Sequence, residues 1–127
     1  MKLLTLLFVL SLLAAGCSAK HGYPPWAIVV ENDSDQTVDA VKIRFDETEL
    51  GYGTLLSNRK NTKTDSLIPA AIPEEVVVSW RSQGGEETKV KVLVKSKLPK
   101  RFSGDVVFTI KNSEMVEVSH RKFPSIP

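Results

Sequence analysis

The sequence contains few of the residues that build disulfide frameworks and metal sites. Its 127 residues include one cysteine, Cys17, and two histidines, His21 and His120. A single cysteine excludes an internal disulfide framework. A zinc site needs three or four ligands, and two histidines far apart in the chain do not suggest one. We therefore expect no metal and no cofactor.

Long apolar runs are also nearly absent, with one exception at the N-terminus. Residues 3–13 follow Lys2, are interrupted only by Thr5 and Ser11, and precede the small residues 14–16. A transmembrane helix needs about 20 apolar residues, so this run is too short to span a bilayer. A basic start, a short apolar stretch and small residues are typical of a secretory signal peptide, which we assign to residues 1–16.

The end of this segment, Leu13-Ala14-Ala15-Gly16-Cys17, resembles the lipobox of bacterial lipoproteins. It departs from the commonest pattern in having Ala14 where a larger aliphatic residue is usual. The resemblance implies that the signal is cut before Cys17 and that the thiol carries a lipid, giving an anchor with at least two acyl chains such as palmitate. Two chains hold a protein stably where one is marginal. The alternative is an ordinary secretory signal with an incidental cysteine.

The lipoprotein resemblance also implies a location. In Gram-negative lipoproteins the residue after the cysteine influences sorting, and Ser18 lacks the aspartate associated with inner-membrane retention. This implies an outer-membrane protein facing the periplasm, or the extracytoplasmic face of the cell membrane in a host without an outer membrane. Residues 17–25 then form the lipidated cysteine and a short tether. Its eight residues after Cys17 reach at most about 29 Å when fully extended.

Residues 26–127 have the composition of a β-rich domain. The mature chain contains 14 Val, 6 Ile and 7 Thr against 6 Leu and 5 Ala, and β-branched residues favour strands. Apolar residues alternate with polar ones in several short runs, which predicts half-buried strands. The apolar faces are Trp26/Ile28/Val30, Val41/Ile43/Phe45, Val76/Val78/Trp80, Val90/Val92/Val94, Val106/Phe108/Ile110 and Val116/Val118, the last followed in phase by His120.

Polar and glycine-containing segments separate these runs. Residues 32–35, 82–85 and 111–114 read as hairpin turns, and residues 55–67 form a longer connection. Pro69 and Pro73 should confine the following segment to a sheet edge or a crossover loop. We therefore predict an all-β fold: a single-domain antiparallel β-sandwich of about seven strands, immunoglobulin-like or transthyretin-like.

The two tryptophans allow two interpretations each. Trp80 falls in phase with Val76 and Val78, so a core position is the first interpretation and an exposed recognition aromatic is the second. Trp26 follows two prolines at the end of the tether. It belongs either to the core or to a contact with the bilayer interface.

Catalytic motifs are not apparent. The pairs Glu74-Glu75 and Glu86-Glu87 are sequence neighbours, and neighbours on a strand point to opposite faces. The chain has no Gly-x-Ser-x-Gly elbow and no phosphate-binding glycine loop. Asp33, Asp35 and Asp39 do not match a calcium-binding EF-hand loop, and an Asp-rich turn forms for local hydrogen-bonding reasons. We predict a binding protein rather than an enzyme.

Charge is distributed unevenly along the mature chain. Residues 17–88 carry 7 basic and 12 acidic side chains, whereas residues 89–127 carry 9 basic and 3 acidic ones. The alternation places Lys89, Lys91 and Lys95 on one strand face, with Lys97, Lys100 and Arg101 in the next loop. This basic region is a candidate contact for an anionic ligand or partner, and the alternative is a solvated face that discourages edge-to-edge pairing. Nucleic acid is not expected, because no basic motif interleaved with aromatics is present.

These observations together predict a lipid-anchored binding protein of the bacterial cell envelope. Its partners would be the membrane, through the anchor, and another envelope protein, with the basic region as the preferred contact. The alternative is an inhibitor or immunity-type lipoprotein that occludes an enzyme or toxin. A third class, a hydrolase with an unrecognised site, would be indicated by turnover of peptidoglycan or lipid.

Overall fold

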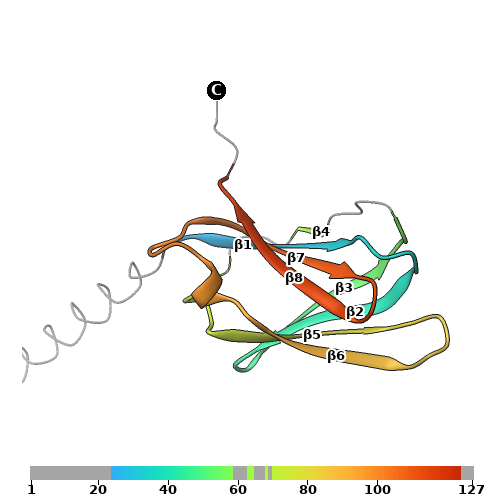
Figure 1. The fold of residues 1–127 in the computed structure, drawn as a ribbon. Coiled ribbons are helices and arrows are strands. Elements are labelled where there is room, and N and C mark those ends of the chain that lie inside the picture. The colour runs from blue at the N-terminus through green and yellow to red at the C-terminus, as the bar shows by residue number, and fades with distance from the viewer. Residues whose placement is uncertain (1–23, 59–62, 65–67, 69, 124–127) are drawn as a thin grey trace, which may run out of the picture.

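The computed structural model describes residues 24–58, 63–64, 68 and 70–123, which form two β-sheets packed face to face (Figure 1). Cys17 and His21 lie outside these residues. Sheet A has the strand order β4-β1-β7-β8 and sheet B the order β3-β2-β5-β6. The strands are β1 (Trp26–Asn32), β2 (Val38–Phe45), β3 (Thr48–Leu55), β4 (Lys63–Thr64), β5 (Glu75–Arg81), β6 (Glu87–Leu93), β7 (Gly104–Lys111) and β8 (Met115–Arg121).

The predicted all-β sandwich is confirmed, with two differences in detail. One pair of strands, β1 and β7, runs parallel from Trp26↔Gly104 to Asn32↔Ile110, whereas the other pairs are antiparallel. The described residues contain eight strands, including the two-residue β4 within the long connection. Besides β4, the sequence did not predict β3, where Gly51 and Gly53 interrupt the alternation and only Leu50, Tyr52 and Leu55 turn toward the core.

The core lies between the sheets and contains the predicted apolar faces, but β1 and β7 are buried along most of their length, so the half-buried pattern predicted for these two strands is wrong. Trp80 is buried in it with Val76 and Val78 from the same strand, so the core interpretation of Trp80 is confirmed. Trp26 is only 1% exposed, and its ring lies 5.9 Å from that of Phe45. Its indole Nε1 donates a 2.7 Å hydrogen bond to the carbonyl of Ala70. The alternative of a bilayer contact for Trp26 is therefore wrong.

Two of the three predicted hairpins are present. The β5–β6 pairing closes at Arg81↔Glu87 and the β7–β8 pairing at Lys111↔Met115. The turn at residues 32–35 is not a hairpin, because β1 belongs to sheet A and β2 to sheet B. The polar residues there turn the chain from one sheet to the other, a change of sheet that local turn chemistry does not reveal.

The sandwich has two ends, which carry different connections. One end is formed by residues 33–37, 82–86 and 112–114 and lies on the right in Figure 1; we call it the loop end. The tether end is opposite and holds the start of β1 at Trp26, the turn at residues 46–47 and the β6–β7 connection at residues 94–103. That connection includes the 3-10 helix η2 (Lys95–Lys97). Within the described ranges, no helix is long and apolar enough to cross a membrane.

Candidate functional site

The loop end contains a cleft of about 450 Å³ between the two sheets. Its apolar part is formed by Val38, Trp80 and Ile110, which are almost completely buried. The polar residues around it come from three connections and the strand ends beside them. They are Ser34, Asp35, Gln36, Ser82, Glu86, Thr88, Lys111, Asn112, Ser113 and Glu114.

The β1–β2 connection beside this cleft is held from inside by the buried side chain of Asn32. Its Nδ2 donates hydrogen bonds to the carbonyls of Gln36 at 2.8 Å and Leu55 at 3.0 Å. Its Oδ1 accepts bonds from the backbone N–H of Ser34 at 3.1 Å and from the Ser34 hydroxyl at 2.6 Å. An asparagine can donate and accept at once, so one side chain ties the connection both to itself and to the end of β3.

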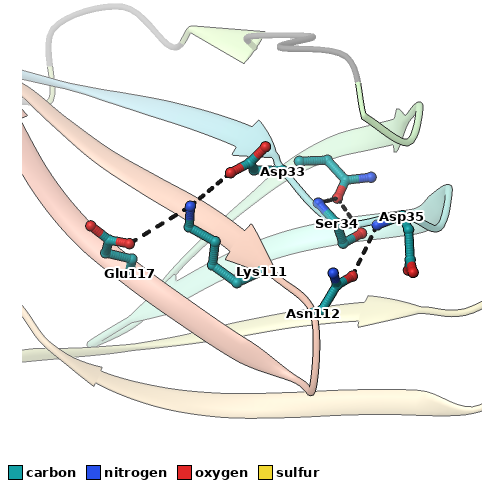
Figure 2. A network of polar contacts seen from close by, with 7 residues as sticks. Asp33, Ser34, Asp35, Lys111, Asn112 and Glu117 are labelled. Atoms are coloured by element: carbon teal, nitrogen blue, oxygen red, sulfur yellow. Dashed lines mark hydrogen bonds and ion pairs between the residues drawn. The ribbon is translucent and has the colours of Figure 1, made fainter.

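A second set of contacts joins this connection to β7 and to the β7–β8 hairpin (Figure 2). The backbone N–H of Asp35 donates to Asn112 Oδ1 at 2.9 Å. Lys111 Nζ lies 2.7 Å from Asp33 Oδ2 and 3.9 Å from Glu117 Oε2. The hydrogen bond to Asp33 is the main reason that the pKa of Lys111 is raised above its ordinary value of 10.5. Two of the three connections around the cleft, β1–β2 and β7–β8, are therefore joined to each other.

The chemistry of the cleft is that of a binding site with an acidic border. Asp35, Glu86 and Glu114 line it, while the one basic side chain there, Lys111, already faces Asp33. Backbone and side-chain donors and acceptors beside an apolar floor suit recognition of a polar or cationic group. Within the part of the chain that the structure describes, no three His, Cys, Asp or Glu side chains are placed to hold a metal ion.

The aspartates that the sequence placed close together have separate structural contacts. Asp33 pairs with Lys111, and the Asp35 backbone bonds to Asn112. Asp39 lies on the outer face of sheet B, where its Oδ1 accepts a 2.9 Å hydrogen bond from the Thr54 hydroxyl. The carboxylates of Asp33 and Asp39 therefore serve the local structure, whereas Asp35 contributes its backbone and its carboxylate borders the cleft.

The predicted basic region divides into two parts. Lys89 and Lys91 are exposed on the outer face of sheet B, as their alternation predicts. The sheet register aligns Lys89 with Ser79 and Lys42, and aligns Lys91 with Val77 and Arg44. We call these four cations, Lys42, Arg44, Lys89 and Lys91, the sheet B basic strip. Glu49 approaches it, with a carboxylate oxygen 3.9 Å from Lys42 Nζ.

The second part of the basic region lies at the tether end. Strand β6 stops at Leu93, so the prediction that Lys95 shares a strand face with Lys89 and Lys91 is wrong. The chain bends into η2 at Lys95, whose ammonium lies 3.7 Å from Glu74. Lys97, Lys100 and Arg101 follow in or beside the β6–β7 connection, as expected, and all three are exposed.

The remaining predicted candidates do not form a reactive group. His120 is an exposed residue near the end of β8, and its ring contacts Phe102 edge to face at 5.1 Å. The carboxylate pairs lie at opposite ends of the sandwich: Glu74-Glu75 precede and begin β5, and Glu86-Glu87 precede and begin β6. The pairs therefore do not converge on one site.

Sequence reasoning missed the cleft because the residues around it come from connections far apart in the chain. The signal that was available is the polar character of all three turns, each with a serine and at least one acidic residue, at residues 32–36, 82–86 and 112–114. Each turn had a local explanation. Only the register of the strands brings the three turns to one end of the sandwich.

Comparison with known proteins bears on the fold alone. No model of a known protein family matches the chain, and no curated protein matches it. Among solved structures, the chain is similar to an NMR structure of a protein from Eubacterium rectale, with a TM-score of 0.52 and 18% identity. The match covers 81% of this chain and 94% of that one. The similarity therefore extends over most of both domains.

Proposed function

We propose that this protein is a lipid-anchored binding protein of the bacterial envelope. In this proposal Cys17 holds it to the membrane, and the loop end engages another envelope protein. The observation that carries the proposal is the cleft at the loop end, opposite to the start of β1, where the β1–β2 connection is hydrogen-bonded to the β7–β8 hairpin.

Two properties of the loop end support a binding role. Loops held by a rigid scaffold can recognise a partner without first losing conformational freedom, which favours affinity. Here Asn32 and Asn112 supply that support from buried and exposed positions respectively. An apolar floor with a polar border is also the usual composition of a recognition surface. The acidic border favours a partner that presents a cationic side chain to the cleft.

Site-specific photo-crosslinking in living cells tests this proposal. A photoreactive amino acid replaces Gln36 or Glu86 at the loop end of the full-length protein, and both positions are exposed. The matched control is Thr48, which is exposed at the opposite end of the sandwich. We expect a covalent adduct with one envelope protein from both loop-end positions and none from Thr48, with the adduct identified by mass spectrometry.

The outcomes separate the proposed roles. An adduct that forms equally from Thr48, or from no loop-end position, would contradict the loop end as the contact. An adduct with a soluble toxin or hydrolase would instead support the inhibitor or immunity role.

A further inference from the structure

We propose that the tether end of the sandwich is a docking surface for the anionic headgroups of the membrane that holds the protein. This inference rests on the proposed lipid anchor and adds to it an orientation and a lipid preference. The basic side chains on this surface come from the β6–β7 connection and from the end of β8. They are Lys95, Lys97, Lys100, Arg101, Arg121 and Lys122, which we call the tether-end basic surface.

The charge of this surface is only partly neutralised by the protein itself. Lys95 lies 3.7 Å from Glu74 Oε1, and Arg121 lies 3.2 Å from Asp105 Oδ2. The other four cations form no ion pair with any of the described residues. Basic side chains near an anionic leaflet each contribute to attraction, so a group of this size gives a lipid-dependent interaction.

The shape of the tether end also suits a lipid surface. A hollow of about 350 Å³ lies between the start of the described chain and the β6–β7 connection, and Pro24 lines it. Its apolar residues include Ile72, Leu98 and Phe102, and its charged ones are Lys95, Lys100 and Arg101. An apolar hollow with a cationic rim matches an amphipathic anion, whose phosphate faces the rim while its apolar part contacts the hollow.

The position of the chain entry brings this surface close to the bilayer. Pro24 and Pro25 immediately precede β1 at the tether end, and only residues 18–25 separate Cys17 from Trp26. That stretch reaches at most about 29 Å. A domain held on so short a tether has its tether end nearest the lipid, so weak attraction is enough to orient it.

Acidic residues lie at both ends of the sandwich, and those at the loop end favour the same orientation. At the tether end, Asp46, Glu74 and Glu75 line a neighbouring hollow, which shares Ala71, Ile72 and Lys95 with the first. At the loop end, Asp35 and Glu114 line the cleft. An anionic bilayer would repel the loop end and attract the tether-end basic surface, which leaves the cleft directed away from the membrane.

The test uses the full-length lipidated chain in vesicles and follows the distance of each end from the lipid. Because Cys17 would be blocked by its lipid and is the only cysteine, a second cysteine can be labelled alone. Ser96→Cys places a fluorophore at the tether end and Gln83→Cys places one at the loop end, and both positions are exposed. A quencher attached to lipid headgroups reports their proximity.

We expect quenching at position 96 to rise when phosphatidylcholine vesicles are replaced by an equal mixture of phosphatidylcholine and phosphatidylglycerol. The rise should disappear at high ionic strength, and quenching at position 83 should stay low throughout. Each basic side chain near an anionic surface increases affinity about fivefold, so the triple variant Lys97→Glu, Lys100→Glu, Arg101→Glu should lose the rise. The control triple variant, Lys42→Glu, Lys89→Glu, Lys91→Glu, changes the net charge by the same amount and should still show the rise in quenching.

Equal quenching at both positions, or equal loss in both triple variants, would overturn the docking surface. Sedimentation with phosphatidylcholine vesicles tests the lipid anchor separately, because uncharged lipid offers nothing to the basic residues. Protein that sediments with both vesicles but shows no selective quenching retains the anchor and refutes the docking surface. If the protein sediments only with the anionic mixture, and the tether-end variant no longer sediments with it, the anchor is refuted and the docking surface is supported.

Discussion

The backbone N–H of Asp35 donates a 2.9 Å hydrogen bond to the side-chain oxygen of Asn112, which lies 77 residues later in the chain. This bond joins the β1–β2 connection to the β7–β8 hairpin across the loop end of the sandwich. Asn32 holds the same connection from its buried side. These two asparagines therefore hold the β1–β2 connection in place, one from inside and one from the surface, and the effects of replacing each can be compared.

Asn32→Ala should destabilise the fold much more than Asn112→Ala. Asn32 is 1% exposed, and its loss leaves the buried groups that it bonds without a partner, which should cost about 3 kcal/mol of unfolding free energy. Asn112 is exposed, so water can replace its bond and the cost should be about 0.5–1 kcal/mol. Urea unfolding followed by tryptophan fluorescence measures both. Equal losses would mean that Asn32 does not have the supporting role described above.

Gly104→Ala should destabilise the protein by about 2–3 kcal/mol. Gly104 begins β7 with φ at +145°, and a Cβ there would collide with the carbonyl oxygen of Arg121 and approach the Phe102 ring. Gly84→Ala is the matched control, because nothing lies within 4 Å of a Cβ at that position. It should change stability by no more than about 0.5 kcal/mol. Denaturant midpoints of the two variants decide the comparison.

Cys17→Ser should release the protein from the membrane fraction, because serine cannot form the thioether through which the lipid is attached. Fractionation of cells followed by a high-salt wash measures the release. The tether-end variant Lys97→Glu, Lys100→Glu, Arg101→Glu is the control, since it keeps the cysteine and should stay in the membrane fraction. Retention of Cys17→Ser after the wash would contradict the lipobox interpretation.

Replacing Lys89 and Lys91 by threonine should promote self-association. Strand β6 is an edge of sheet B, and lysines on an edge strand discourage pairing with another chain. The control is Lys42→Thr, which removes a cation from the same basic strip but from β2, a strand that is paired on both sides. Analytical ultracentrifugation should show dimers or larger species only for the β6 variant. A double variant that stays monomeric would mean that the lysines do not protect this edge.

The sequence predicted the sandwich and much of its core because alternation is a local property. Side chains two residues apart on a strand face the same way, so the pattern from Val76 to Trp80 identifies a buried face without knowledge of its neighbours. The same reasoning failed for β3, where Gly51 and Gly53 supply no side chain to alternate. It also extended the β6 pattern to Lys95, although the strand ends two residues earlier.

The candidate site needed the tertiary structure at every step. The cleft forms where three connections meet, and the basic strip forms because the register aligns Lys42 with Ser79 and Lys89. Neither relationship has a local signal, since residues distant in the chain become neighbours only when strands pair. The parallel pairing of β1 with β7 is of the same kind, because the alternation within a strand is identical in both directions.

The β-branched alternation was by itself enough to predict an all-β chain, the short apolar run predicted export, and the lipid anchor is what the resemblance of residues 13–17 to a lipobox implies. These are properties of composition and local spacing. Only the tertiary structure decided that the basic region is divided between the outer face of sheet B and the tether end, and that the joined loops lie opposite. The physical reason is that charge and shape act through distances in space, which the packing of the two sheets determines.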